Sequence, residues 1–328
     1  MTQMLAACAF GVTLSGAALA EDYQALAKVE SWTITRGVEQ GGCMMQKVNA
    51  DGYLVQIGKT AAGHDFGRLA VYTSDKDAYV LEGESKDVTF DLDGERFFGK
   101  ATMEAAGGGY RGGYAEANNR AFGEALARKY VLTINPDSKN AIIIDLKGTF
   151  KAMEAVRECD VISRAILTIQ ASSEYWLLSI DAVAAWLSLT ASNPHAAALA
   201  KEAKAALIFP EITKAGLGIG GAGGKGVMMT RERNLGYYKT TSITFGAQAG
   251  VQSYGYVVMF LTDAALDKFM STKGYKLGVD GSFVLIDAGA TAEIDTATLQ
   301  ADTVGFVFDE QGLMLNFVLE GARIKELK

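Results

Sequence analysis

A cluster of glycines in the second half of the chain restricts the fold more than any other feature of the sequence. Seven glycines lie within the eleven residues from Gly216 to Gly226, and two windows satisfy the G-x-G-x-x-G pattern of dinucleotide-binding loops. That loop requires a helix after the glycines, but a short β-type run follows at 227–230 and a turn-like segment at 231–236. A P-loop is excluded because Lys225 is followed by glycine and not by serine or threonine. The cluster therefore predicts a glycine-rich β-segment that bends or lies close to another backbone.

Ordered motifs surround the glycine cluster and continue toward the C-terminus. An apolar run ends in Phe209-Pro210, and Lys214-Ala215-Gly216 leads into the glycines. The later motifs lie at 236–238, 245–250, 257–261, 265–269, 278–282, 312–314 and 319–322. Together they resemble the SYLF domain, a lipid-binding family of bacteria, fungi, plants and animals whose yeast member is associated with actin patches. The resemblance covers about residues 172–328 and implies that the ligand is an anionic phospholipid.

The residue pattern of this second half predicts a helical pair followed by a curved antiparallel sheet. Apolar residues at three- and four-residue steps predict a helix over about 173–190. Asn193-Pro194 has the cap chemistry of a second helix, which we expect to run to about 206. The first helix carries Trp176 and Trp186, a residue type that favours membrane interfaces. It has no lysine or arginine, so packing on the sheet is the favoured interpretation. A short helix is expected at 263–270 within the sheet.

The first half of the chain predicts a small antiparallel β domain with two helices over residues 21–160. The expected strands lie at 31–35, 53–57, 69–72, 78–81 and 97–103, with a hairpin formed by 131–134 and 141–144. Helices are expected at 118–129 and 150–157, and residues 161–171 are expected to link the two domains. The glycines of 107–114 predict a flexible connector, since glycine is expensive to order. The chain is therefore α+β, and this half faintly resembles the compact periplasmic domains of the invasion-associated type.

The first twenty residues predict a secretory signal peptide. Residues 1–20 carry no charged side chain, and Ala18-Leu19-Ala20 forms an A-x-A cleavage pattern before Glu21. Cys8 lies in a segment resembling a lipoprotein box, but almost no apolar region precedes it, so lipidation is not favoured. We therefore expect a periplasmic or secreted protein that meets a membrane peripherally. In an exported chain the remaining pair, Cys43 and Cys159, predicts a disulfide, the alternative being two buried thiols.

Two histidines are too few for most catalytic or metal-binding arrangements. His64 and His195 fall in different predicted domains, and neither has a second histidine or a cysteine at metal-ligand spacing. No G-x-S-x-G pattern follows the signal peptide. We therefore expect no cofactor, no metal and no enzymatic activity. The net charge of −7 argues against a nucleic-acid partner.

A local excess of positive charge supplies the predicted ligand contacts. Residues 201–239 contain seven basic and three acidic side chains, which gives a local net charge of +4. The candidate lipid-binding residues in this segment are Lys214, Lys225, Arg231, Arg233 and Lys239. The prediction is a non-enzymatic protein that recognises anionic phospholipid headgroups through this group. The alternative is an envelope adaptor or structural protein that binds another protein through residues 21–160.

Overall fold

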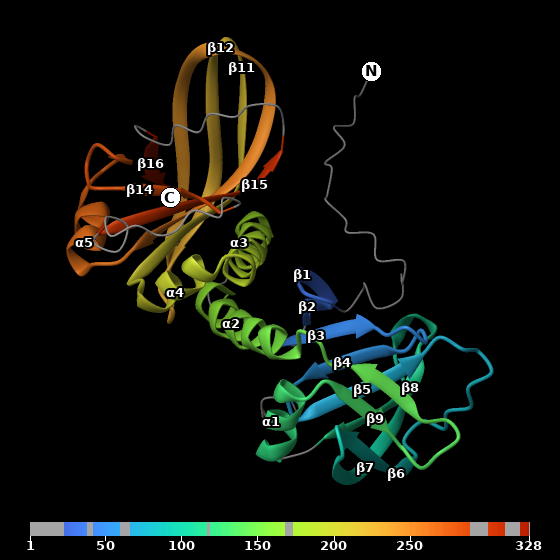
Figure 1. The fold of residues 1–328 in the computed structure, drawn as a ribbon. Coiled ribbons are helices and arrows are strands. Elements are labelled where there is room, and N and C mark those ends of the chain that lie inside the picture. The colour runs from blue at the N-terminus through green and yellow to red at the C-terminus, as the bar shows by residue number, and fades with distance from the viewer. Residues whose placement is uncertain are drawn as a thin grey trace, which may run out of the picture.

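The computed structural model describes residues 23–37, 42–59, 66–116, 119–167, 173–288, 301–311 and 322–327. The predicted signal peptide and Cys8 lie outside these residues. Within them the chain forms a ten-stranded antiparallel sheet, a smaller curved sheet and five helices (Figure 1). The α+β prediction is confirmed.

The first sheet contains β1 to β10 in the order β1-β2-β3-β4-β5-β8-β7-β6-β9-β10. Its strands are β1 (Tyr23–Val29), β2 (Trp32–Gly37), β3 (Cys43–Val48), β4 (Leu54–Gly58), β5 (Arg68–Thr73), β6 (Ser85–Leu92), β7 (Glu95–Ala105), β8 (Arg111–Glu116), β9 (Val131–Ile134) and β10 (Ile142–Asp145). The predicted β9–β10 hairpin is confirmed. Residues 78–81 form a loop and not the expected strand, because Tyr79 and Leu81 point to solvent and have no core to face.

The glycine segment at 107–114 is part of this sheet, so the prediction of a flexible connector is wrong. A 3₁₀ turn, η1 (Gly107–Gly109), leads into β8, which lies between β5 and β7. A Cβ atom on Gly112 would lie 2.1 Å from the carbonyl oxygen of Val71. Glycine is therefore needed because the neighbouring backbone leaves no room for a side chain.

Two helices pack on the first sheet: α1 (Arg120–Arg128) and α2 (Thr149–Leu167). Asn119 caps α1 through its side-chain oxygen, which accepts a hydrogen bond from the backbone N–H of Ala121 at 3.0 Å. The first seven residues of the expected 161–171 linker belong to α2. The helix continues because Ile162 and Ala165 extend its buried stripe. Residues 168–172 lie outside the described residues.

The predicted helical pair is α3 (Ser173–Ser192) and α4 (Pro194–Glu202). The side chain of Asn193 accepts hydrogen bonds from the first backbone N–H groups of α4, as its cap chemistry predicts. The second helix ends at Glu202, earlier than expected, because Ala205 and Ala206 already begin a buried strand. Helices α2 and α3 lie between the two sheets and join them into one core (Figure 1).

The interpretation that α3 packs inside the protein is confirmed. Trp186 is only 2% exposed, and its indole N–H donates to a carboxylate oxygen of Glu158 on α2 at 3.1 Å. Near the other end of the helix, the ring of Tyr175 stacks on that of Tyr237 with centroids 4.3 Å apart. The hydroxyl groups of Tyr237 and Ser179 are 3.1 Å apart. The helix therefore fixes the curved sheet against the first domain.

The second sheet is built on a long hairpin. Its elements are β11 (Ala205–Met229), β12 (Asn234–Phe260), β13 (Tyr275–Lys276), β14 (Val284–Asp287), β15 (Thr303–Gln311) and β16 (Arg323–Glu326), with the predicted short helix at α5 (Asp263–Ser271). The pairing is antiparallel except for β14 with β15, which are parallel. The predicted curved antiparallel sheet is therefore confirmed, with that one parallel edge.

The hairpin folds back over itself, and glycines permit it. The second half of β11 crosses the first half so closely that a Cβ on Gly226 would lie 2.5 Å from the carbonyl oxygen of Ile208. A Cβ on Gly224 would lie 2.3 Å from that of Glu211. Register shifts after Phe209 accompany the bend. The glycine cluster thus shapes the sheet, and the space between the two layers is filled by an apolar and aromatic core.

Candidate functional site

Three lysines stand in register across three neighbouring strands of the curved sheet. Lys225 of β11 is the direct partner of Lys239 on β12, and Lys239 is the direct partner of Lys325 on β16. All three side chains are exposed. Directly paired residues project to the same face of a sheet, with neighbouring strands about 4.8 Å apart. The row therefore concentrates positive charge on the outer face of this layer.

Two further cations extend this row. Thr241 and Arg323 are direct partners two residues further along their strands, and Arg323 is in turn the partner of Lys276 on β13. Arg323 and Lys276 are exposed, while the residue between Arg323 and Lys325, Ile324, is 2% exposed. This alternation places the charges outside and the apolar side chain in the core. We call Lys225, Lys239, Lys276, Arg323 and Lys325 the basic face.

The strands are held in this register by the apolar side of the same layer. Ile324 belongs to the core between the two layers, together with Tyr238 and Tyr275. The ring of Phe269 from α5 packs on those of Tyr238 and Tyr275, with centroids 5.4 and 5.1 Å apart. Burial and the nearby Glu326 raise the pKa of Tyr238 to about 12, so it stays neutral at physiological pH. The basic face therefore lies over a buried, aromatic core.

The structure places two of the five predicted lipid contacts, Lys225 and Lys239, on the basic face. Lys214 is elsewhere: it is 5% exposed, and its direct partner Gln252 is 2% exposed. Arg231 and Arg233 are exposed in the turn that joins β11 to β12. The guanidinium of Arg231 forms an ion pair with Glu158 of α2, 2.9 Å between the closest atoms, and a longer bond to the backbone oxygen of Ala200. The predicted group of five is therefore not one surface.

Lys214 faces an interior that is polar as well as aromatic. Burial raises the pKa of Tyr254, the neighbour of Lys214 along this face, to about 12. Tyr256 is 1% exposed, and burial raises its pKa further. Thr240, from the opposite layer, is also buried. Lys214 thus belongs to the inside of the folded hairpin and does not reach a membrane surface in this conformation.

The other three members of the basic face were not found from the sequence. Lys276, Arg323 and Lys325 lie outside the 201–239 segment, in a stretch where acidic residues outnumber basic ones. Counting the net charge of local segments therefore does not point to these three residues. The charged–apolar–charged order of Arg323, Ile324 and Lys325 is the one signal in the sequence. The register that brings Lys325 opposite Lys239 is a long-range property.

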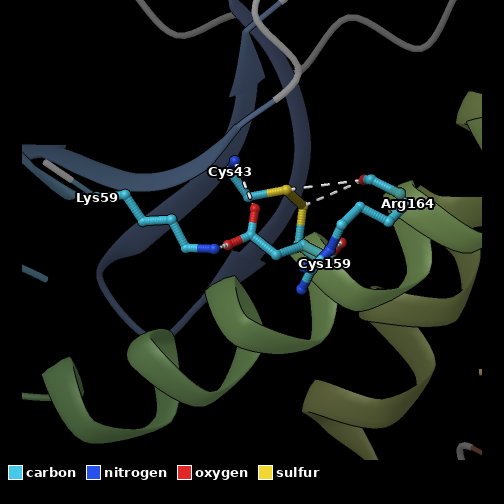
Figure 2. The surroundings of a disulfide bond; sticks show 6 residues. Cys43, Lys59, Cys159 and Arg164 are labelled. Carbon is cyan, nitrogen blue, oxygen red and sulfur yellow. Dashed lines mark hydrogen bonds and ion pairs between the residues drawn. A yellow bond between two sulfur atoms is a disulfide. The ribbon is translucent and has the colours of Figure 1, made fainter. Parts of the chain in front are cut away.

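The predicted disulfide between Cys43 and Cys159 is present, and it links β3 to α2 with a Cα–Cα distance of 6.1 Å. Both cysteines are buried, and Figure 2 shows the bond beside Lys59 and Arg164. The alternative of two buried thiols is wrong. The link closes a loop with a sequence separation of 116 residues, so it constrains the unfolded chain strongly.

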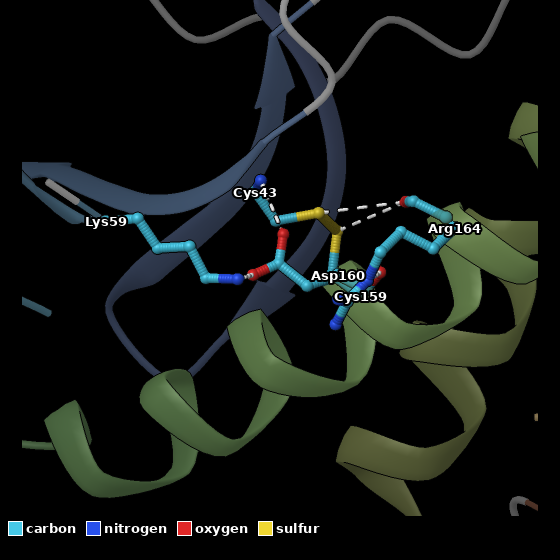
Figure 3. A network of polar contacts seen from close by, with 6 residues as sticks. Cys43, Lys59, Cys159, Asp160 and Arg164 are labelled. Atoms are coloured by element: carbon cyan, nitrogen blue, oxygen red, sulfur yellow. Dashed lines mark hydrogen bonds and ion pairs between the residues drawn. A yellow bond between two sulfur atoms is a disulfide. The ribbon is translucent and has the colours of Figure 1, made fainter. Parts of the chain in front are cut away.

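A buried carboxylate lies next to the disulfide. Asp160, 6% exposed, accepts a hydrogen bond from the backbone N–H of Cys43 at 3.0 Å and forms an ion pair with Lys59 at 2.6 Å (Figure 3). Burial lowers the pKa of the nearby Arg36, and attraction to Asp160 opposes this shift. The disulfide and this carboxylate together fasten β3, which lies between β2 and β4 in the sheet, to the helix that continues toward the second domain.

Among the described residues, histidine, cysteine, aspartate and glutamate side chains form no cluster of three or more that could hold a metal ion. Nor does any helix in the described part of the chain have the length and apolar character needed to cross a membrane. The arrangement offers cations fixed on a rigid sheet, a chemistry suited to holding anions electrostatically.

Comparisons with known proteins agree with the resemblance of the C-terminal motifs. Residues 241–328 match the model of the Ysc84 family, described as "Las17-binding protein actin regulator", the family that carries the SYLF domain. No curated protein matches the chain. Among solved structures, invasion-associated protein B from Bartonella henselae matches 41% of this chain and 95% of its own, at 13% identity and a TM-score of 0.29. A structural match this distant carries no argument about function.

Proposed function

We propose that the protein binds anionic phospholipid headgroups at a membrane surface through the basic face and catalyses no reaction on them. The observation that carries the proposal is the row formed by Lys225, Lys239 and Lys325 in direct register. Like charges directly opposite each other destabilise a sheet. The register nevertheless places three in a row, with Arg323 and Lys276 beside them, so an anionic membrane surface would meet several cations at once.

The expected binding energy is electrostatic and modest for each residue. A lysine or arginine near an anionic membrane surface contributes about 1 kcal/mol, and the attraction decays over a Debye length of about 8 Å at physiological salt. Because the cations of the basic face project from neighbouring strands of one sheet, they can contact the surface together. Binding should therefore weaken steeply as salt is added.

The family match supports a binding role for the same region. Residues 241–328 include Lys276, Arg323 and Lys325, and the matching family is described as a Las17-binding protein. We further propose that the chain is exported to the periplasm or secreted. The apolar segment at 1–20 and the disulfide, which oxidising compartments favour, support export.

A second candidate function is protein binding through the first domain. Its described surface exposes four large aromatic side chains, Tyr79 at 81%, Phe98 at 77%, Tyr130 at 75% and Phe150 at 54%. Aromatic residues are enriched in protein interfaces. Under this alternative the protein is an envelope adaptor, and the curved sheet supports the first domain without binding lipid.

Vesicle flotation of residues 21–328 separates the two functions. The chain is mixed with zwitterionic vesicles or with vesicles containing anionic phospholipid, each at low and high salt. The proposal predicts flotation with anionic vesicles only, and loss of flotation at high salt. Salt-resistant binding to both vesicle types, or no binding to either, would contradict it. No binding to either vesicle type would favour the adaptor function.

A further inference from the structure

A groove of about 430 Å³ lies where α2, the end of α3, α4 and the β11–β12 turn meet. One stripe of α2 forms a wall, with Lys151, Ala155 and Glu158 at three- and four-residue steps, and α4 contributes a parallel stripe that includes Ala197 and Ala200. Lys151 and Val161 both line it, so it runs about 15 Å along the axis of α2. The volume lies within the ordinary range for small-molecule sites, about 300–1,000 Å³.

The lining of the groove separates into an apolar floor and a charged rim. Seven of its fourteen residues are alanine, valine or proline, and small side chains predominate. The rim holds four cations, Lys151, Arg157, Lys201 and Arg231, against two carboxylates. It therefore has a net charge of +2.

The carboxylates of the rim leave part of this positive charge uncompensated. Glu158 is already engaged, since it accepts from the indole of Trp186 and pairs with Arg231. Lys151 pairs with Glu30 outside the groove at 2.8 Å. No ion pair joins Lys201 or Arg157 to another residue that the structure describes. Glu154 is the one remaining carboxylate of the lining for these two cations, and the guanidinium of Arg157 lies over the ring of Phe66, 4.7 Å from its centroid. The two cations thus outnumber this carboxylate, so the rim favours a negatively charged group.

We infer that this groove binds a single-chain amphiphilic anion, that is, one acyl chain ending in a carboxylate or a phosphate. The apolar floor takes the chain, and Lys201 with Arg231 takes the acidic group. The groove spans both halves of the molecule, from Val29 and α2 to α4 and Arg231. A bound ligand would therefore link the first domain to the curved sheet. The site is separate from the basic face, because none of the five residues of the basic face lines the groove and Arg231 lies in the turn beyond the end of β11.

The structure provides an internal reporter for this site. Trp186, at 2% exposure, donates to Glu158, whose other carboxylate oxygen contacts Arg231 at 2.9 Å. An acidic ligand that draws Arg231 toward itself changes the environment of the Trp186 indole through Glu158. Ligand binding should therefore alter tryptophan fluorescence, and replacing Trp186 with phenylalanine should remove most of that change without abolishing binding.

The test measures binding of monomeric ligands to the full chain by calorimetry, below their micelle concentrations. Decanoate and dodecanoate represent a fatty acid, and a short-chain lysophosphatidate represents a phospholipid product. Dodecylammonium and dodecanol carry the same apolar chain as dodecanoate, but the first is positively charged and the second is neutral. We expect saturable one-to-one binding of at least one anionic class and at least tenfold weaker binding of the cationic and neutral probes. Equal binding of all probes, or no saturable binding of the anions, would overturn the inference.

Two groove variants, each with a matched control, test whether the ligand binds in the groove. Ala197→Trp fills the floor, whereas Ala198→Trp adds the same side chain to the exposed face of α4, outside the groove. Lys201→Glu reverses a rim charge, and Lys139→Glu does so at an exposed site in the first domain. Ala197→Trp and Lys201→Glu should each weaken binding at least tenfold while their controls do not. Unchanged binding in both groove variants would place the ligand elsewhere and overturn the inference. Because the assay contains no membrane, failure of vesicle binding leaves this test unaffected.

Discussion

Lys225 and Lys239 are direct cross-strand partners on the outer face of the curved sheet, although thirteen residues, including a turn, lie between them in the sequence. Their neighbours on the inner face, Gly224 and Gly226, are the residues that let β11 fold back on itself. The glycine cluster and the basic face are thus two sides of one structural element. The close crossing of β11 over itself requires glycine on the inner face, and the same segment places Lys225 on the outer face.

Gly226→Ala should destabilise the protein by about 1–3 kcal/mol, the usual cost of overpacking. The added Cβ would lie 2.5 Å from the carbonyl oxygen of Ile208 and 2.6 Å from the ring of Phe209. Gly221→Ala is the matched control, since its nearest atom would be 3.7 Å away. Denaturant unfolding measures both. Equal stability of the two variants would show that β11 does not pass over itself at Gly226.

Removing the disulfide by the double change Cys43→Ala and Cys159→Ala should lower the free energy of unfolding by about 2–5 kcal/mol. The bond closes a long loop and joins β3 to α2, so its loss frees the unfolded chain more than the folded one. Denaturant unfolding with and without a reductant measures the effect. The parent chain should lose stability in reductant, and the double variant should show no response to it.

Asp160→Asn should destabilise the protein by about 1–3 kcal/mol. The change leaves Lys59 beside a neutral group, while the hydrogen bond from the backbone of Cys43 can be kept. Breaking a fully buried ion pair costs about 3–5 kcal/mol, and the one-third exposure of Lys59 reduces that value. Asp137→Asn removes an exposed partner of Arg96 and should change stability by less than about 1 kcal/mol. Similar losses in the two variants would contradict the assigned role of Asp160.

Stability should fall in strongly alkaline solution because of buried tyrosines. Burial raises the pKa of Tyr254 from 10.0 to about 12, so the folded protein holds this proton more tightly than the unfolded chain. The contribution of Tyr254 is complete below pH 10 and is lost as the pH rises through about 12. Tyr254→Phe should therefore reduce the loss of stability measured between pH 9 and 12. An identical pH profile in this variant would show that Tyr254 ionises as readily when folded as when unfolded.

Much of the fold can be predicted from local chemistry, and the failures have physical causes. Asn193 signals a helix start through its capping side chain. The runs around Pro136 signal the β9–β10 hairpin. Tyr79 and Leu81 have strand-like character but no core to face. Gly112 looks like part of a flexible connector, because nothing in the sequence shows that the backbone of Val71 lies against it.

The candidate site could be predicted only in part, for the same reason. Lys225 and Lys239 are visible because they fall in a basic segment, but burial of Lys214 depends on which way the strand faces after the bulge that follows Phe209. Lys325 enters the site through pairing between strands more than eighty residues apart. Local charge counts carry no information about such register.

The most direct test of the account is vesicle flotation of the Lys239→Glu variant of residues 21–328, with Arg233→Glu as the matched control. Lys239 is the centre of the lysine row, whereas Arg233 is an exposed cation of the same basic segment, in the turn outside the row. The account predicts that Lys239→Glu weakens flotation with anionic vesicles at least tenfold at low salt, while Arg233→Glu has little effect. Circular dichroism confirms that both variants are folded. Undiminished flotation of a folded Lys239→Glu variant would contradict the proposal that the basic face meets the membrane.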